Sequence, residues 1–208
     1  MVKHDALVVI DVQNDFMPGG SLAVSGADRI VPLVNGLALE FDSVVITQDW
    51  HPSNHISFAS RHSGKKPFDS IELPYGRQVL WPVHCVQGTR GAALHPELHI
   101  PRAQLILRKG FHADIDSYSA FLEADRKTPT GLSGYLANRG ITRLFLAGLA
   151  TDFCVAWSAL DARQCGFDVA VVEDATRAID VSDSLTAAWR AMKQAGVGRV
   201  QAAEIVSR

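Results

Sequence analysis

The sequence has few cysteines: three among 208 residues, Cys85, Cys154 and Cys165. An odd count at this low density excludes a disulfide framework, which small secreted domains build from many paired cysteines. We therefore expect a cytoplasmic protein, in whose reducing surroundings each thiol is free to pack, to bind a metal or to act as a nucleophile. Composition alone does not choose among these three roles.

Long apolar runs and an excess of one charge are also lacking. No run approaches the roughly 18 residues that span a bilayer, and the apolar N-terminal stretch 6–12 is too short for a signal-peptide core. The 20 Lys and Arg against 22 Asp and Glu leave a net charge of −2, with His neutral. This balance argues against a protein that binds nucleic acid by neutralising phosphates. We expect neither a membrane nor a nucleic acid as partner.

Short apolar runs are present, and they alternate with stretches of helical spacing. Most of the runs are continuous blocks of Val, Ile and Leu, which is typical of strands buried on both faces of a parallel sheet: 6–10, 43–47, 104–108, 143–148, 168–173 and 199–203. Amphipathic stretches lie at 30–41, 132–140, 153–166 and 182–196, the last with Ser182 or Ser184 as a candidate N-cap. The alternation predicts an α/β fold: a doubly wound, mostly parallel six-stranded sheet with helices on both faces. With no repeat or linker in the sequence, we expect one domain over 1–208.

The segment from about 50 to 101 does not follow this alternation. It is rich in His, Pro, Gly and Ser, and it contains six of the eight histidines. A loop of this length is uncommon inside a compact domain and is usually functional; its part 62–80 is either a lid or a rigid wall. Ligands of open α/β sheets bind beyond the carboxyl ends of the strands, so the chemistry is sought there.

Two opposite charges follow two of the predicted strands. Asp11 comes directly after the first strand, and Lys109 comes directly after the third. A buried carboxylate or ammonium group is costly unless it is paired, so the two are natural partners if their strands are neighbours. Spacing alone favours a structural ion pair over a catalytic one.

The second predicted strand leads into Asp49-Trp50-His51. Residues i and i+2 of an extended segment point to the same side, so Asp49 and His51 can converge on one ion. Two ligands are too few for a metal site, and a third would come from His55, His62 or His84. Such a set suits Zn, Fe or Mn without selecting one. The alternative is a solvated turn in which a histidine is hydrogen-bonded to an aspartate.

The fourth predicted strand leads through small residues to Cys154. A tight turn here places the cysteine in the first turn of the next helix, where the helix N-terminus and a nearby lysine stabilise a thiolate. Free N–H groups of the same turn suit a developing oxyanion. This context makes a nucleophile as well supported as an inert buried thiol, whereas we assign Cys85 and Cys165 to packing.

Six motifs, in this order along the chain, resemble those of the nicotinamidases in the isochorismatase-like cysteine hydrolase family: IDVQNDF at 10–16, QDWHP at 48–52, WPVHCVQGT at 81–89, RKG at 108–110, SYSAF at 117–121 and GLATDFC at 148–154. Each motif is modest by itself, and together they are specific. The set Asp49, His51 and His84 within these motifs separates the nicotinamidases from metal-free relatives.

The resemblance implies roles for particular residues. It implies a catalytic triad of Asp11, Lys109 and Cys154, and one divalent metal ion, with Zn favoured over Fe or Mn, held by Asp49, His51 and His84. His55 stays open as a further ligand. It also implies a pocket with aromatic walls formed by Phe16, Trp81 and Tyr118. The backbone N–H groups of Ala150 and Cys154 would form an oxyanion hole, and the peptide bond between Leu149 and Ala150 would be cis.

The activity implied by the resemblance is the deamidation of nicotinamide to nicotinate and ammonia through a thioester, in NAD salvage, with pyrazinamide as a further substrate. The substrate would then be a small molecule, and a homo-oligomer is the default assembly. One alternative is a related cysteine hydrolase that acts on another small amide or carbamoyl compound. A second is a metal-binding or regulatory α/β domain without enzymatic activity.

Overall fold

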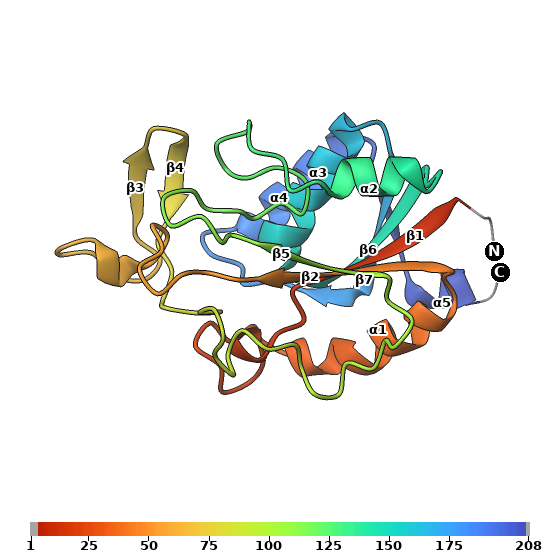
Figure 1. Ribbon diagram of the computed structural model, residues 1–208, viewed down its shortest axis with the longest axis horizontal. Helices are drawn as coiled ribbons and strands as arrows, with labels where there is room; N and C mark the ends of the chain where they lie inside the picture. Colours follow the sequence, from red (N-terminus) through yellow and green to blue (C-terminus); the bar gives the residue numbers. More distant parts are fainter. Residues whose placement is uncertain (1–3, 207–208) are drawn as a thin grey trace.

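Six parallel strands form the central sheet of the computed structural model, which describes residues 4–206 (Figure 1). Their spatial order is β5-β2-β1-β6-β7-β8, and every neighbouring pair is parallel. The strands are β1 (Asp5–Ile10), β2 (Ser43–Asp49), β5 (Leu105–Lys109), β6 (Arg143–Leu149), β7 (Asp168–Arg177) and β8 (Gly198–Val200). Each contains one of the predicted apolar runs or overlaps it.

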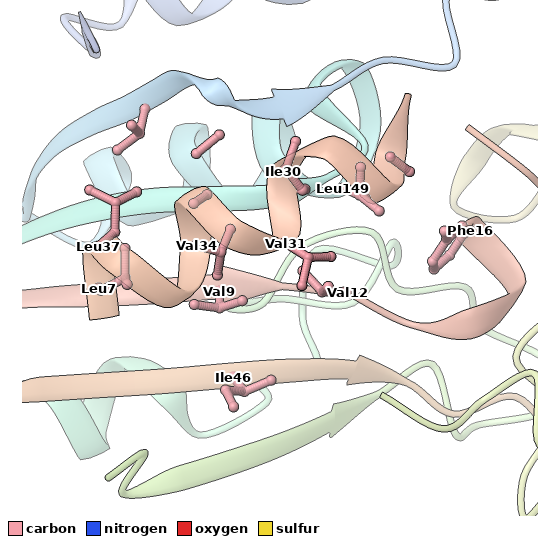
Figure 2. Close-up of a cluster of buried hydrophobic side chains, with 14 of the residues drawn as sticks. Leu7, Val9, Val12, Phe16, Ile30, Val31, Val34, Leu37, Ile46 and Leu149 are labelled. Atoms are coloured by element: carbon pink, nitrogen blue, oxygen red, sulfur yellow. The ribbon is translucent and has the colours of Figure 1, made fainter. Parts of the chain in front are cut away.

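Helices cover both faces of this sheet, as Figure 1 shows. One face carries α1 (Val31–Leu39) and α5 (Ala202–Val206), and the other carries α2 (Leu132–Asn138), α3 (Ala156–Gln164) and α4 (Ser184–Gln194). Side chains alternate along β1, so Leu7 and Val9 pack under α1 (Figure 2) while Ala6, Val8 and Ile10 join the opposite core. The predicted doubly wound parallel sheet is confirmed.

The C-terminal segment differs from its prediction as a strand over 199–203. Strand β8 ends at Val200, and α5 begins at Ala202. Glu204 accepts a hydrogen bond from the Gln201 N–H at 2.7 Å, and the Asp174 carboxylate accepts one from the Ala202 N–H at 2.9 Å. Both bonds satisfy N–H groups at the start of a helix, which a five-residue apolar pattern does not reveal.

The start of α4 also differs from the prediction of a serine cap. Asp183 occupies the N-cap position, with φ of 64° and no capping hydrogen bond from its side chain. The Ser184 hydroxyl donates instead to the Asp152 carboxylate at 2.5 Å. The prediction of Ser182 or Ser184 as the N-cap is therefore wrong, because the Ser184 hydroxyl binds a carboxylate outside the helix.

The segment 50–101 is folded over the carboxyl edge of the sheet. It contains a two-stranded antiparallel hairpin, β3 (Ser70–Leu73) and β4 (Gly76–Val79), which projects beyond that edge (Figure 1). Buried Gln78 donates hydrogen bonds to the Asp116 carboxylate at 2.6 Å and to the Tyr118 hydroxyl at 3.0 Å. These bonds tie the hairpin to the segment that follows β5. No helix within residues 4–206 is both long enough and apolar enough to cross a membrane.

Candidate active site

The carboxyl ends of β1, β2, β5 and β6 bring four reactive side chains together. Lys109 lies at the centre of this group; it is fully buried and pairs in register with Asp49 of β2. Its Nζ lies 2.9 Å from an Asp11 carboxylate oxygen, 3.5 Å from Cys154 Sγ and 2.9 Å from the Ser117 carbonyl oxygen, and it forms an ion pair with Asp49. The predicted partnership of Asp11 and Lys109 is present in the structure, and Asp49 shares the same ammonium group.

One carboxylate oxygen of Asp11 is hydrogen-bonded, and the other makes only the ion pair with Lys109. Its Oδ1 accepts a hydrogen bond from the Thr47 hydroxyl at 2.7 Å. Its Oδ2 lies near Lys109 without hydrogen-bond alignment, and among the described residues it is the buried side-chain oxygen that has no hydrogen-bond partner. Because a carboxylate oxygen of Asp11 and the sulfur of Cys154 lie within 4.8 Å, the site holds a proton acceptor beside the thiol.

Burial sets the protonation states of this group. Burial raises the pKa of the Cys154 thiol well above its usual value; Lys109 opposes the rise, and the Asp11 and Asp49 charges add to it. Burial likewise raises the pKa of Asp11, against the opposing charge of Lys109. Burial acts to lower the pKa of Lys109, but the two carboxylates outweigh it and raise that pKa. Burial therefore opposes the stabilisation of a Cys154 thiolate by the helix N-terminus and Lys109, and it makes the neighbouring Asp11 carboxylate more basic.

Asp49 faces a second group on its other side, made with His51 and His84. Its Oδ2 lies 3.6 Å from His51 Nε2 and 3.9 Å from His84 Nε2. The Nδ1 atoms of the two rings lie 2.8 Å from the Gly110 carbonyl oxygen and 2.9 Å from that of Pro82. A carbonyl only accepts hydrogen bonds, so each Nδ1 is the protonated nitrogen, and in a neutral ring Nε2 keeps its lone pair.

This donor set fits a divalent metal ion. One carboxylate and two imidazole nitrogens converge within 4.8 Å, and each histidine is oriented by a second hydrogen bond, as metal-binding histidines are. Burial lowers the pKa of His84 to about 4, so this ring stays neutral at neutral pH as a ligand must, whereas the Asp49 carboxylate outweighs burial at His51 and raises the pKa of that ring. Close packing at Gly110 supports the same arrangement, since a Cβ there would lie 2.5 Å from the His51 ring.

The other candidate third ligands lie outside this group. His55 stacks on the His51 ring with centroids 4.1 Å apart, but both of its nitrogens are bound by the protein. Nε2 lies 3.2 Å from the Ile115 carbonyl oxygen and must donate to it, so Nδ1 accepts from the Ser57 hydroxyl at 2.7 Å. His62 Nε2 lies 2.7 Å from the Ile56 carbonyl oxygen. The structure thus groups His84, and not His55 or His62, with Asp49 and His51.

A pocket joins the two groups. Its lining contains every predicted pocket, oxyanion and metal residue together with Cys154, while Asp11 and Lys109 lie fully buried below it: Phe16, Leu22, Asp49, His51, Trp81, His84, Asp116, Tyr118, Ala150, Phe153, Cys154 and Ile179. The rings of Trp81 and Phe153 stand nearly perpendicular with centroids 4.8 Å apart, and Trp81 Nε1 donates to the Tyr118 hydroxyl at 3.0 Å. The walls are therefore aromatic and held by their own contacts.

Four lining residues were not predicted. Phe153 precedes the cysteine in the GLATDFC motif, and Asp116 immediately precedes the SYSAF motif, so both had a sequence signal. Leu22 and Ile179 come from loops after the first and seventh strands, where no pattern marks them. Ile179 is held by a hydrogen bond from its N–H to the Asp152 carboxylate at 3.0 Å.

The turn that carries Cys154 is a single π-helical turn, Thr151–Val155. The N–H groups of Phe153 and Val155 both donate to the Ala150 carbonyl at 3.1 Å. The peptide bond between Leu149 and Ala150 is cis, as predicted. Ala150 and Cys154 line the same pocket, and the role of their N–H groups as an oxyanion hole stays a prediction.

Comparison with known proteins places this fold and site in one family. Residues 5–204 match the Isochorismatase domain, and the chain belongs to the isochorismatase family. Within that family it is an amidohydrolase: it is 62% identical over 201 residues to a nicotinamidase of Acinetobacter baylyi, covering 97% of this chain and 94% of that protein.

Solved structures agree with this relation. A nicotinamidase and pyrazinamidase of Acinetobacter baumanii superimposes with a TM-score of 0.98 at 60% identity, covering 99% of each chain. The PnC1 protein of L. infantum, solved with nicotinate, gives a TM-score of 0.86 at 39% identity over 98% of this chain and 96% of that one. A pyrazinamidase of Pyrococcus horikoshii, solved with zinc, gives a TM-score of 0.78 at 36% identity, covering 95% of this chain and 99% of that one.

Proposed function

We propose that this chain hydrolyses nicotinamide to nicotinate and ammonia, and pyrazinamide likewise, as a step of NAD salvage. The observation that carries the proposal is the single aromatic pocket in which Cys154 and the Asp49, His51 and His84 group both take part. A flat pyridine ring between aromatic walls would place its amide at the thiol and its ring nitrogen at the histidines. The relatives named above, among them a structure with nicotinate, support the same substrate class.

The proposed reaction begins at the resting thiol. Asp11 takes the proton from Cys154 as the sulfur attacks the carboxamide carbon, and the carbon–oxygen π electrons move to the oxygen. The raised pKa of Asp11 brings it closer to the pKa of an effective base, and Lys109 keeps that carboxylate oriented and compensated. The N–H groups of Ala150 and Cys154 receive the oxyanion.

Breakdown of the tetrahedral adduct gives the thioester. The C–N bond breaks, the proton held by Asp11 passes to the leaving nitrogen, and ammonia departs. Asp11 is then unprotonated again and takes a proton from the attacking water. When the C–S bond breaks, the proton on Asp11 returns to the sulfur, and the acid that is released gives up its remaining proton to solvent to become nicotinate.

Asp49, His51 and His84 would hold the metal ion, and we propose zinc. When bound, the ion supplies a Lewis-acidic contact for the pyridine nitrogen. Within this arrangement Phe16, Trp81 and Tyr118 restrict the ring to one plane. Correct placement of the amide relative to Cys154 is the main rate advantage that such positioning gives.

Ammonia release from a panel of aromatic amides tests the proposal. Nicotinamide and pyrazinamide should be hydrolysed, and benzamide, which has the same ring size but no ring nitrogen, should be turned over at least about 100-fold more slowly, a typical loss when a bound polar contact is missing. Chelation should remove nicotinamide turnover, and zinc, iron and manganese should be compared in restoring it. Full activity in metal-free protein, or equal rates with benzamide, would contradict the proposal.

A further inference from the structure

Side chains continue the connection between β1 and β2 beyond the point where their backbones stop pairing. The parallel ladder runs from Ala6 opposite Ser43 to Val9 opposite Ile46. The chain then turns at Asp11, whose φ is 50°. There Thr47 Oγ1 accepts a hydrogen bond from the Asp11 N–H at 3.2 Å and donates to the Asp11 carboxylate at 2.7 Å.

Gln13 makes the next connection two residues further along both segments. Its side chain is fully buried, and its Oε1 accepts a hydrogen bond from the Asp49 N–H at 2.8 Å. Its Nε2 donates to the Asp49 carbonyl oxygen at 2.8 Å and to the Ala92 carbonyl oxygen at 2.8 Å. The amide thus binds both backbone groups of Asp49, as a neighbouring strand would, and both of its N–H bonds are used.

Asp49 is the residue at which the two halves of the site meet. Its Oδ1 pairs with Lys109, and its Oδ2 lies against His51 and His84. It is the last residue of β2. The position of its carboxylate therefore depends on what holds the backbone at the end of this strand. Strand β5 holds one side through the Asp49–Lys109 register, and Gln13 holds the other.

We propose that Gln13 is a positioning residue for the metal group: it fixes the backbone of Asp49 and thereby the carboxylate that binds a divalent cation. The inference rests on the proposed function only for the presence of a metal at Asp49, His51 and His84. Gln13 does not line the pocket, so it acts through Asp49. Loss of its amide is therefore expected to weaken metal binding, whereas loss of a buried glutamine that does not contact Asp49 is not.

Two other glutamines, one in β2 and one beside it, provide matched controls. Gln48 is also buried, and its Nε2 donates to the same Ala92 carbonyl oxygen at 2.7 Å, but it makes no hydrogen bond to Asp49. Gln104 makes the same two-sided connection near the opposite end of β2: its Oε1 accepts from the Val44 N–H and its Nε2 donates to the Asp42 carbonyl oxygen, both at 2.7 Å. Gln48 thus matches Gln13 in burial and in its bond to Ala92, and Gln104 matches it in binding both an N–H and a carbonyl group of the β2 backbone.

The experiment measures zinc affinity by competition with a chromophoric chelator, using wild-type protein and the Gln13→Met, Gln48→Met and Gln104→Met variants, each stripped of metal first. Gln13→Met should bind zinc about 10- to 100-fold more weakly than wild type, the loss typical of residues that orient metal ligands. The two controls should bind as wild type does. Gln13→Met binding zinc as tightly as the controls, or wild type binding none, would overturn the inference.

Melting curves of all variants show whether each is folded at the assay temperature. If Gln13→Met is not, Gln13→Asn carries the same test, because it keeps the amide but is one methylene too short to reach Asp49. Nicotinamide turnover is measured separately at saturating zinc. A wild-type protein that binds zinc without hydrolysing nicotinamide would reject the proposed function, and the zinc affinities would still decide the role of Gln13.

Discussion

The middle of β1 and its carboxyl end are equally buried and chemically opposite. Leu7, Val8, Val9 and Ile10 have no exposed surface, and neither has Asp11, the next residue. The hydrocarbon side chains are stabilised by burial. The carboxylate loses its hydration there and depends on Thr47 and Lys109 for compensation.

This contrast indicates what each region contributes. The strand middles supply the stability that holds the sheet together. The carboxyl edge carries buried charges that cost stability, and it is the region in which the reactive groups converge. Substitutions in the strand middles should therefore lower stability alone. Substitutions at the carboxyl edge should lower activity, and some of them should change stability as well.

The largest effect is expected at the nucleophile. Cys154→Ala should lower kcat for nicotinamide at least about 10⁴-fold, because no other group in the pocket can form the thioester. Its melting temperature should stay close to that of wild type, since one sulfur atom is lost. Ammonia release and thermal melting are the measurements. Cys165→Ala, at an exposed position, serves as control and should leave both unchanged; substantial turnover by Cys154→Ala would refute the assignment.

Removal of the buried ammonium group should affect both properties. Lys109→Met leaves Asp11 and Asp49 without their shared cation, and breaking a buried pair in this way costs about 3–5 kcal/mol in the free energy of unfolding. Urea denaturation measures this cost, and activity should be lost as well. The exposed Lys193→Met variant should differ from wild type by less than about 0.5 kcal/mol. A Lys109→Met protein as stable as wild type would show that the pair is dispensable.

A strand-middle substitution should lower stability only. Leu7→Ala removes a fully buried side chain under α1 and should lower the free energy of unfolding by about 2–5 kcal/mol. Below its melting temperature its kcat should equal that of wild type. Ile106→Ala, on the half-exposed side of β5, is the matched control with little expected effect. A large fall in kcat for folded Leu7→Ala would mean that the two regions are not separable.

The smallest effect concerns pH. Burial, with the His51 charge, lowers the pKa of His55 to about 4 from its usual 6.5. As the pH falls from about 6.5 to 4, the unfolded chain therefore takes up a proton at this residue and the folded chain does not, which lowers stability. His55→Asn should have a melting temperature that declines less steeply over this window. His99→Asn, at an exposed position, should follow the wild-type profile, and identical slopes for all three proteins would contradict the shift.

The fold was predictable to the extent that local patterns dictated it. Continuous Val, Ile and Leu runs located all six strands, because strands covered on both faces have no polar side. The predicted last strand, 199–203, extends past the end of β8 at Val200 into α5, because Glu204 and Asp174 determine the start of α5 through hydrogen bonds that no apolar pattern contains. No local pattern predicts the hairpin β3–β4 for a similar reason: its buried Gln78 is held by residues 38 and 40 positions away.

The sequence by itself determined which residues follow the strands, and in parallel strands this is enough to bring Asp11, Asp49, Lys109 and the turn to Cys154 to one edge. Only the tertiary structure decided how they are used. Asp49 serves both groups, His84 joins it while His55 is bound elsewhere, and burial raises the pKa of the Cys154 thiol. Distances across strands and the loss of water around each charge decide these points, and both arise only when the chain is folded.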